Sequence, residues 1–155
     1  MRGRGRALCA ALAIALVASA AAAQTTNPRF GKWKLKSENA NSTNIMTYES
    51  YNGTGMKVTV ETTNASTGNK SSWGYTTMFD GQGQPVTGQN GTDTAIVRVV
   101  NEKINEITYK QGDRVVQFLV NVLSADGQSI EVTYYSTNAQ GVTNMTKATY
   151  ERQPQ

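Results

Sequence analysis

The sequence predicts an all-β protein, a single antiparallel up-and-down β-barrel of about eight to ten strands. Short runs rich in Val, Ile, Thr and Tyr alternate with turn dipeptides such as Asn52-Gly53, Asp80-Gly81 and Asn90-Gly91. Connections of about two to six residues favour hairpins between successive strands. Such a sheet leaves two exposed edges unless it curls and closes, so a barrel is favoured, with a two-sheet sandwich as the alternative.

The strands follow from the positions of these runs. The first begins around Phe30, contains Trp33 and carries lysines on alternate positions, and the last ends at Arg152. We expect strands over residues 30–37, 43–51, 55–63, 71–79, 94–100, 104–111, 114–124, 128–137 and 144–152, with a short tenth around 85–87. The segment Gly81-Gln82-Gly83 is interpreted as a turn.

Alternation predicts which side chains face the barrel interior. Trp33 and Leu35 share one face of the first strand, opposite the lysines. The strand over 114–124 is apolar on both faces, which indicates a strand covered on both sides. We expect an inward row on the fourth strand and companions from neighbouring strands to line an apolar pocket with a few hydroxyls: Met56, Val58, Trp73, Tyr75, Phe79, Phe118 and Tyr134.

The first 23 residues have the pattern of a signal peptide. Arg2, Arg4 and Arg6 precede an apolar, alanine-rich run, and Ala21-Ala22-Ala23 supplies a small-residue cleavage site. We therefore expect a signal peptide over 1–23, one barrel domain over 24–155, and a periplasmic or secreted location without a transmembrane segment in the mature chain.

Charge and residue content limit the chemistry. The chain has 15 Lys and Arg against 11 Asp and Glu, and three of the basic residues lie in the leader, so residues 24–155 carry 12 against 11. No basic stripe remains for nucleic acid. Histidine is absent and the single cysteine, Cys9, lies in the leader. We expect no enzymatic activity, no metal and no cofactor, because the usual general bases, thiol nucleophiles and soft ligands are missing.

The two ends of the chain resemble the calycins, that is, lipocalins and fatty-acid-binding proteins. Gly31-Lys32-Trp33 matches the Gly-x-Trp that opens the first strand of that family, and Tyr150-Glu151-Arg152 matches its last strand. The resemblance implies structural roles for Gly31, Trp33 and Arg152, with the arginine packed over the tryptophan ring. Tyr75 to Gly81 and Pro85 to Gly88 are also similar to a group of small exported bacterial proteins described as lipocalin-like.

The resemblance departs from fatty-acid-binding proteins at two points. Asn39 to Asn44 leads almost directly into the next strand, where those proteins carry a helical lid. Their carboxylate-binding arginine, two residues before the final tyrosine, corresponds to Ala148 here. The sequence therefore predicts a barrel that lacks both the lid and the carboxylate clamp.

Three functional hypotheses follow from these observations. The first is an exported lipocalin-like barrel that binds a small, mostly apolar molecule in its interior. The alternative is a barrel filled by its own side chains, acting as a structural or protein-interaction module of the cell envelope. A membrane barrel with apolar faces in lipid is disfavoured, because most strands are shorter than the ~9–11 residues needed to span a bilayer.

We predict cleavage after Ala23. Mass spectrometry of the protein recovered from the envelope or medium should find Gln24 at the N-terminus, either free or cyclised. Recovery of a mature product that retains residues 1–23 would contradict the export hypothesis.

Overall fold

The described part of the protein consists of strands and their connections. The computed structural model describes residues 27–37 and 41–154, so the expected leader lies outside the described residues. The strands are β1 (Gly31–Leu35), β2 (Ser42–Tyr51), β3 (Gly55–Asn64), β4 (Lys70–Thr77), β5 (Asp80–Pro85), β6 (Thr94–Asn101), β7 (Ile104–Gln111), β8 (Arg114–Leu123), β9 (Ser129–Thr137) and β10 (Thr143–Arg152).

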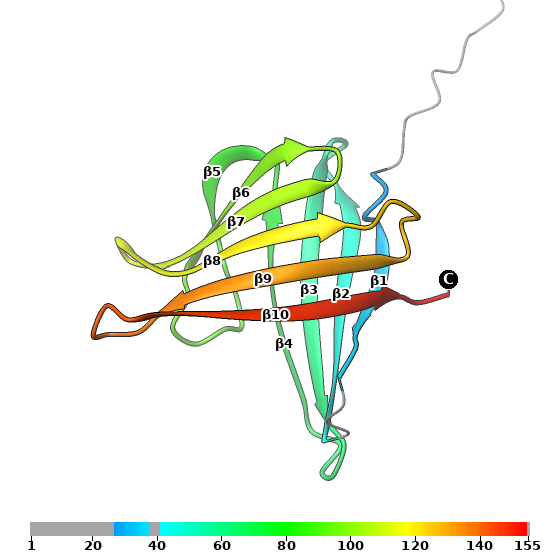
Figure 1. Cartoon of the computed structure of the whole chain (residues 1–155), viewed down its shortest axis with the longest axis horizontal. Coiled ribbons are helices and arrows are strands. Elements are labelled where there is room, and N and C mark those ends of the chain that lie inside the picture. The colour runs from blue at the N-terminus through cyan, green and yellow to red at the C-terminus, as the bar shows by residue number, and fades with distance from the viewer. Residues whose placement is uncertain (1–26, 38–40, 155) are drawn as a thin grey trace, which may run out of the picture.

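All ten strands belong to one antiparallel sheet, in the order β4-β3-β2-β1-β10-β9-β8-β7-β6-β5. Successive strands pair with each other except at β4–β5, and β1 also pairs with β10, which brings the two ends of the chain together. Figure 1 shows β2, β3 and β4 running across β6–β10, so that the sheet curls around a central core. The predicted up-and-down barrel is confirmed, in a form that is nearly closed.

Local sequence explains the tight turns. Asn52 and Gly53, between β2 and β3, have φ angles of 43° and 82°. Both angles lie in the left-handed region, which glycine adopts freely and asparagine tolerates better than other residues. The Asn-Gly pair therefore sets the hairpin that places β2 beside β3, with Tyr51 opposite Gly55.

The fifth strand differs from the prediction. Asp80–Pro85 forms β5, whereas the sequence indicates a turn at Gly81–Gly83 and a short strand over 85–87. Pairing with β6 overrides the weak strand preference of glycine, at the cost of a register shift between Asp80 and Gly83. The expected strand over 71–79 also ends earlier, at Thr77, because Phe79 has a φ of 60° and leaves the extended conformation.

One end of the barrel is closed by Trp33, which is completely buried. The guanidinium carbon of Arg152 lies 4.1 Å from the centre of the Trp33 ring. Arg152 also donates to the carbonyl oxygens of Gly127 at 2.7 Å, Phe30 at 2.9 Å and Pro28. The arginine thus combines a cation–π contact with hydrogen bonds that fasten the N-terminal segment over the barrel end.

A second arginine lies beneath the same end. Arg29 is 3% exposed and donates to the carbonyl oxygens of Glu102 at 3.1 Å and Lys103 at 2.7 Å. Its own carbonyl oxygen accepts the indole N–H of Trp33 at 2.8 Å. Arg29 therefore links the N-terminal segment to the β6–β7 turn, which is distant from it in the sequence.

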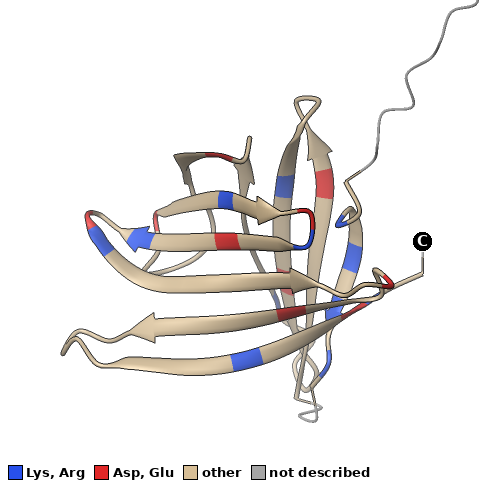
Figure 2. Ribbon diagram, turned by 45° about the horizontal axis from the view of Figure 1, so that its top comes forward, with Lys and Arg blue, Asp and Glu red and all other residues tan. Residues whose placement is uncertain are grey.

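The outer surface carries charges of both signs. Figure 2 shows lysines and arginines interspersed with acidic residues over the strands, without a continuous stripe of one sign. Exposed ion pairs join Lys147 to Glu131 at 3.0 Å and Lys36 to Glu151 at 3.1 Å. Such exposed pairs contribute little stability, so the fold depends on its core.

Trp33→Ala should lower the free energy of unfolding by about 3–5 kcal/mol, because it leaves a large cavity at the closed end. Arg152→Ala should cost less than Trp33→Ala, since the ring stays buried. Denaturant unfolding measures both, with the exposed neighbour Lys34→Ala as the control, which should stay within about 0.5 kcal/mol of wild type. An unchanged midpoint for Trp33→Ala would show that the closed end does not stabilise the barrel.

Candidate functional site

The barrel encloses a small cavity of about 110 Å³. Its lining comes from both crossing layers of the sheet and consists of aromatic, aliphatic and amide side chains. The lining residues are Asn44, Met46, Tyr48, Val58, Val60, Trp73, Tyr75, Ile107, Tyr109, Gln117, Leu119, Asn121, Val132, Tyr134 and Tyr150. No lysine, arginine, aspartate or glutamate is among them, so the cavity wall is uncharged.

Aromatic rings form one side of this cavity. Trp73 and Tyr75 on β4 have ring centres 6.4 Å apart, and Tyr109 on β7 meets both edge-on, at 5.8 Å and 5.9 Å. Edge-to-face contacts at these distances are favourable because the positive ring edge meets the negative ring face. The three rings therefore pack β4 against β7 across the barrel, although these strands are not neighbours in the sheet.

Hydrogen bonds order the polar groups inside the barrel. The Asn121 side-chain amide donates to the Tyr48 hydroxyl at 3.1 Å, and that hydroxyl donates to the Met46 sulfur at 2.9 Å. The hydroxyls of Tyr134 and Tyr150 lie 3.3 Å apart and share a hydrogen bond. The tyrosines are thereby held in place as well as buried.

Two amide oxygens in the cavity lining remain without a hydrogen-bond partner among the described residues. They are Oδ1 of Asn44 and Oδ1 of Asn121, and both atoms are buried. The nitrogen of each amide is engaged, Asn44 with the Thr62 hydroxyl at 3.0 Å and Asn121 with Tyr48. Because an unpaired buried acceptor is costly, these oxygens favour a guest that donates a hydrogen bond.

The interior holds its tyrosines in the neutral form. Burial raises the pKa of Tyr75 to about 12, an effect that its hydrogen bond with Tyr109 partly offsets. Burial also raises the pKa values of Tyr48, Tyr109, Tyr134 and Tyr150. In a low-dielectric interior a tyrosinate is disfavoured, and the same penalty applies to a charged guest.

The structure brings four of the seven predicted lining residues to the cavity: Val58, Trp73, Tyr75 and Tyr134. Met56 is buried in the core but outside the cavity lining. Phe79 lies at the closed end, where it lines a separate pocket of about 450 Å³ with Arg29, Val99 and Asn105. The expectation that Phe79 continues the inward row of β4 is wrong, because the chain turns out of the strand before reaching it.

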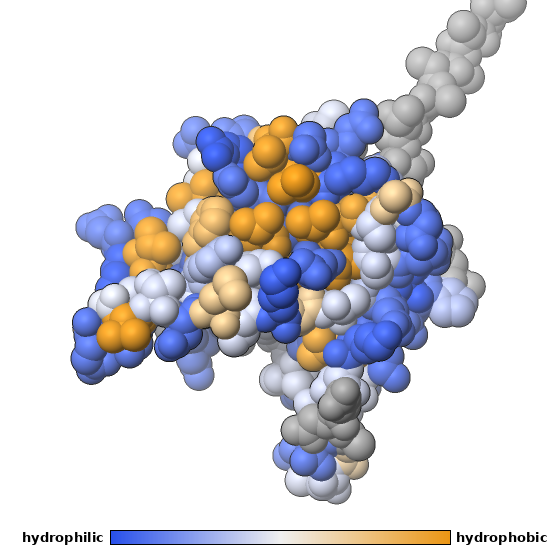
Figure 3. All heavy atoms as spheres, viewed as in Figure 1, coloured by the Kyte–Doolittle hydropathy of each residue, from blue (hydrophilic) through white to orange (hydrophobic). Residues whose placement is uncertain are grey.

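Phe118 faces outward, which corrects the prediction for β8. Its neighbours Gln117 and Leu119 line the cavity, while the Phe118 ring lies 6.0 Å from that of Tyr135 on the next strand. Figure 3 shows apolar side chains gathered on this outer face, over the strands nearest the viewer. The inward face of β8 carries two amides that find internal partners: Asn121 bonds to Tyr48, and Gln117 bonds to the Ser136 hydroxyl at 2.7 Å.

Sequence reasoning missed several interior residues, above all Tyr48, Tyr109 and Tyr150. Their signal was present, because each lies two residues from an apolar residue of the same face: Tyr48 from Met46, Tyr109 from Ile107 and Tyr150 from Ala148. The inward amides carried no such signal. Asparagine and glutamine are usually exposed, and only the three-dimensional partner shows why these are buried.

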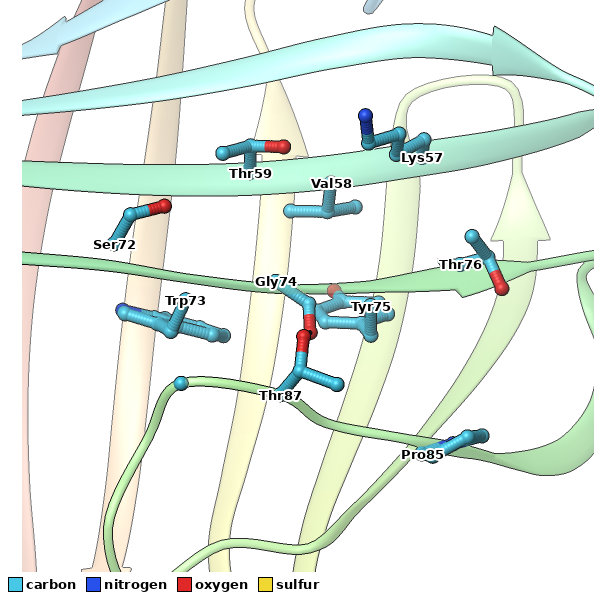
Figure 4. Close-up of a pocket in the computed structure, with 11 residues that line it drawn as sticks. Lys57, Val58, Thr59, Ser72, Trp73, Gly74, Tyr75, Thr76, Pro85 and Thr87 are labelled. Atoms are coloured by element: carbon cyan, nitrogen blue, oxygen red, sulfur yellow. Dashed lines mark hydrogen bonds between the residues drawn. The ribbon is translucent and has the colours of Figure 1, made fainter.

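A groove of about 420 Å³ lies where β4 approaches the end of β5. Figure 4 shows its lining, with Thr59 and Lys57 on one side, Thr87 and Pro85 on the other, and Trp73 and Tyr75 on β4 between them. Val58, Trp73 and Tyr75 line both this groove and the central cavity. The two spaces are therefore separated by shared side chains.

Two classes of feature are absent from the part of the chain that the structure describes. Residues 27–37 and 41–154 hold no group of three or more His, Cys, Asp and Glu residues that could hold a metal ion. They also include no helix long and apolar enough to cross a membrane.

The comparisons with known proteins identify no family. No family model matches the chain, and no curated protein matches it. Among solved structures the chain is similar to a redesigned β-barrel, at 14% identity and a TM-score of 0.42, over 82% of this chain and 93% of that one. The calycin resemblance stays a prediction.

The raised pKa values of the buried tyrosines predict that the fold loses stability at alkaline pH. A tyrosine whose pKa in the folded state lies above its unfolded value of about 10 contributes its full stabilisation below pH 10. This contribution is lost as the pH rises from about 10 toward the folded-state pKa, because the unfolded chain then loses the proton first. The free energy of unfolding should therefore fall between about pH 10 and 12, and Tyr75→Phe should make that fall shallower. Denaturant unfolding at a series of pH values measures this; an identical slope in Tyr75→Phe would contradict it.

Proposed function

We propose that this protein is an exported barrel that binds a small, neutral, mostly apolar molecule in its central cavity. The observation that carries the proposal is the wall of the cavity: a cluster of aromatic rings beside two buried amide oxygens without partners. Export rests on the leader sequence. The chemistry is that of a ligand site, which combines apolar contact with a few polar groups that fix orientation.

The size and polarity of the cavity narrow the ligand class. At about 110 Å³ the cavity is close to the ~150 Å³ of an engineered cavity that takes up benzene. A single aromatic ring of this size would fit, and the unpaired oxygens of Asn44 and Asn121 favour a ring that carries a hydrogen-bond donor. The uncharged wall and the raised tyrosine pKa values disfavour an ion. A single ring bearing one hydroxyl or N–H group fits these constraints, and phenol is the simplest probe.

A filled barrel is the second candidate function. The small volume of the central cavity favours it: the cavity measures about 110 Å³, whereas ligand pockets typically measure about 300–1,000 Å³. In that case the tyrosines serve as core, and the protein acts through its outer surface.

Phenol binding distinguishes the two functions. The chain contains two tryptophans, which serve as probe and internal control. Trp73 lines the cavity, and Trp33 lies buried at the closed end. In ¹⁵N–¹H spectra a phenol titration should shift the Trp73 indole resonance saturably and leave that of Trp33 in place. No saturable shift at Trp73, with phenol at millimolar concentration, would refute the ligand-binding function and leave the filled barrel.

Two buried asparagines provide a matched pair of variants. Asn121 and Asn105 are register partners on β8 and β7, each 4% exposed, but only Asn121 lines the cavity. Asn121→Leu should weaken phenol binding about tenfold by removing the acceptor, while benzene binding stays within about threefold of wild type. The Asn105→Leu variant should bind phenol and benzene with the affinities of the wild type. Equal phenol affinity in the two variants would exclude the amide as acceptor.

A further inference from the structure

The barrel wall is not sealed between β4 and β5. A single bridge links Gly74 on β4 to Thr87, two residues beyond the end of β5: the Gly74 N–H donates to the Thr87 carbonyl and the Thr87 N–H to the Gly74 carbonyl, both at 3.0 Å. Among the described residues no ladder pair joins β4 to β5 itself. The backbone pairing at this seam therefore consists of two hydrogen bonds.

Pro85 explains why the ladder does not continue. Residues two apart on a strand direct their backbone N–H to the same side, so the nitrogen of Pro85 faces β4 as that of Thr87 does. Counting from the bridge, the antiparallel partner of Pro85 is Thr76. Proline has no N–H to donate to the Thr76 carbonyl, and pairing stops there.

Gly88 allows the close approach on the other side of the bridge. A side chain at Gly88, which has a φ of 81°, would run into the carbonyl oxygen of Ser72. The seam is thus tight at Ser72 and Gly88 and opens toward Thr76 and Pro85.

The groove at this seam is lined by residues from both faces of β4. Successive residues of a strand face opposite sides of the sheet. The groove is nevertheless lined both by Ser72 and Thr76 and by their inward-facing neighbours Trp73 and Tyr75 (Figure 4). The groove therefore borders, from the outside, residues that also line the cavity, and Trp73, one of them, is half-buried.

We propose that the groove and the central cavity form one ligand site that crosses the barrel wall at the β4–β5 seam. The site takes a neutral ring compound with an unbranched apolar tail, the ring inside the barrel and the tail in the groove. This inference rests on the proposed function. The shared residues Val58, Trp73 and Tyr75 are the boundary that a bound molecule crosses, and the groove's volume of about 420 Å³ brings the whole site into the range typical of ligand pockets.

The groove lining fits an uncharged tail. Apolar surface comes from Val58, Trp73 and Pro85, and the polar groups are mainly hydroxyls. Lys57 is the one charged residue in the lining, and its ammonium lies 3.7 Å from the Glu49 carboxylate. A ligand anion would have to compete with that carboxylate, so the site favours a neutral molecule.

The experiment compares phenol with 4-butylphenol by calorimetric titration of the purified protein. Burial of the butyl chain in the groove should make 4-butylphenol bind at least about tenfold more tightly than phenol. Thr76→Phe fills the groove from its outer side, so it should bring the affinity for 4-butylphenol within about threefold of that for phenol, with phenol affinity unchanged. Thr108→Phe is the matched control, because Thr108 is also a half-buried strand threonine facing outward and lies outside the groove lining.

The outcomes separate the two proposals. Failure of wild type to bind phenol or 4-butylphenol refutes the proposed function and this inference with it. Phenol binding without a gain from the butyl chain refutes only the extended site. A gain that persists in Thr76→Phe places the tail elsewhere and also refutes it. A gain lost in Thr76→Phe and kept in Thr108→Phe supports the site across the wall.

Discussion

The barrel depends on the burial of Trp33 between two arginines that come from opposite ends of the chain. β1 is the shortest strand, yet it pairs with both β2 and β10 and so joins the β2–β4 layer to the β6–β10 layer. Arg152 covers the Trp33 ring, and the indole N–H is held by the backbone of Arg29. Apart from this cluster, the two layers are continuous in the sheet only through a five-residue strand, and their other contacts are side-chain packing across the interior and the bridge at Gly74.

The cluster also compensates for the lack of covalent cross-links. The single cysteine of the sequence lies in the expected leader, so residues 24–155 cannot form a disulfide. The guanidinium groups of Arg29 and Arg152 act as non-covalent cross-links instead. Arg29 donates to carbonyl oxygens of the β6–β7 turn and of Asn121 on β8, and Arg152 donates to those of Gly127 and Phe30. Arginine suits this role better than lysine, since its planar fork presents several donors in fixed directions.

Alternation and turn residues were sufficient to predict the strands, their meander and the antiparallel barrel. They failed where tertiary pairing outweighs local preference. β5 is rich in glycine and would not form alone, but it is templated by β6. On β8 both faces are apolar, so the direction of Phe118 depends on the partners that Gln117 and Asn121 find inside the barrel. No sequence pattern reports those partners.

The candidate site was predictable only in part, for a related reason. Val58, Trp73, Tyr75 and Tyr134 follow from alternation, but Tyr109 reaches Trp73 from a strand that is not adjacent in the sheet. Such a contact depends on how tightly the sheet curls, which the spacing of residues does not specify. The seam could not be predicted either, because it depends on how the sheet closes on itself. Pro85 is visible in the sequence, but its position opposite Thr76 follows from the bridge between Gly74 and Thr87.

The same seam bears on how the protein behaves at high concentration. An open sheet presents two edge strands whose free backbone groups can pair with other molecules and start aggregation. Here the two edges, β4 and β5, face each other across a narrow gap within one molecule, and Pro85 interrupts the donors of one of them. Each edge therefore shields the other from a neighbouring chain. A barrel with so little backbone pairing at its seam can in this way avoid exposing a template for intermolecular β-sheet growth.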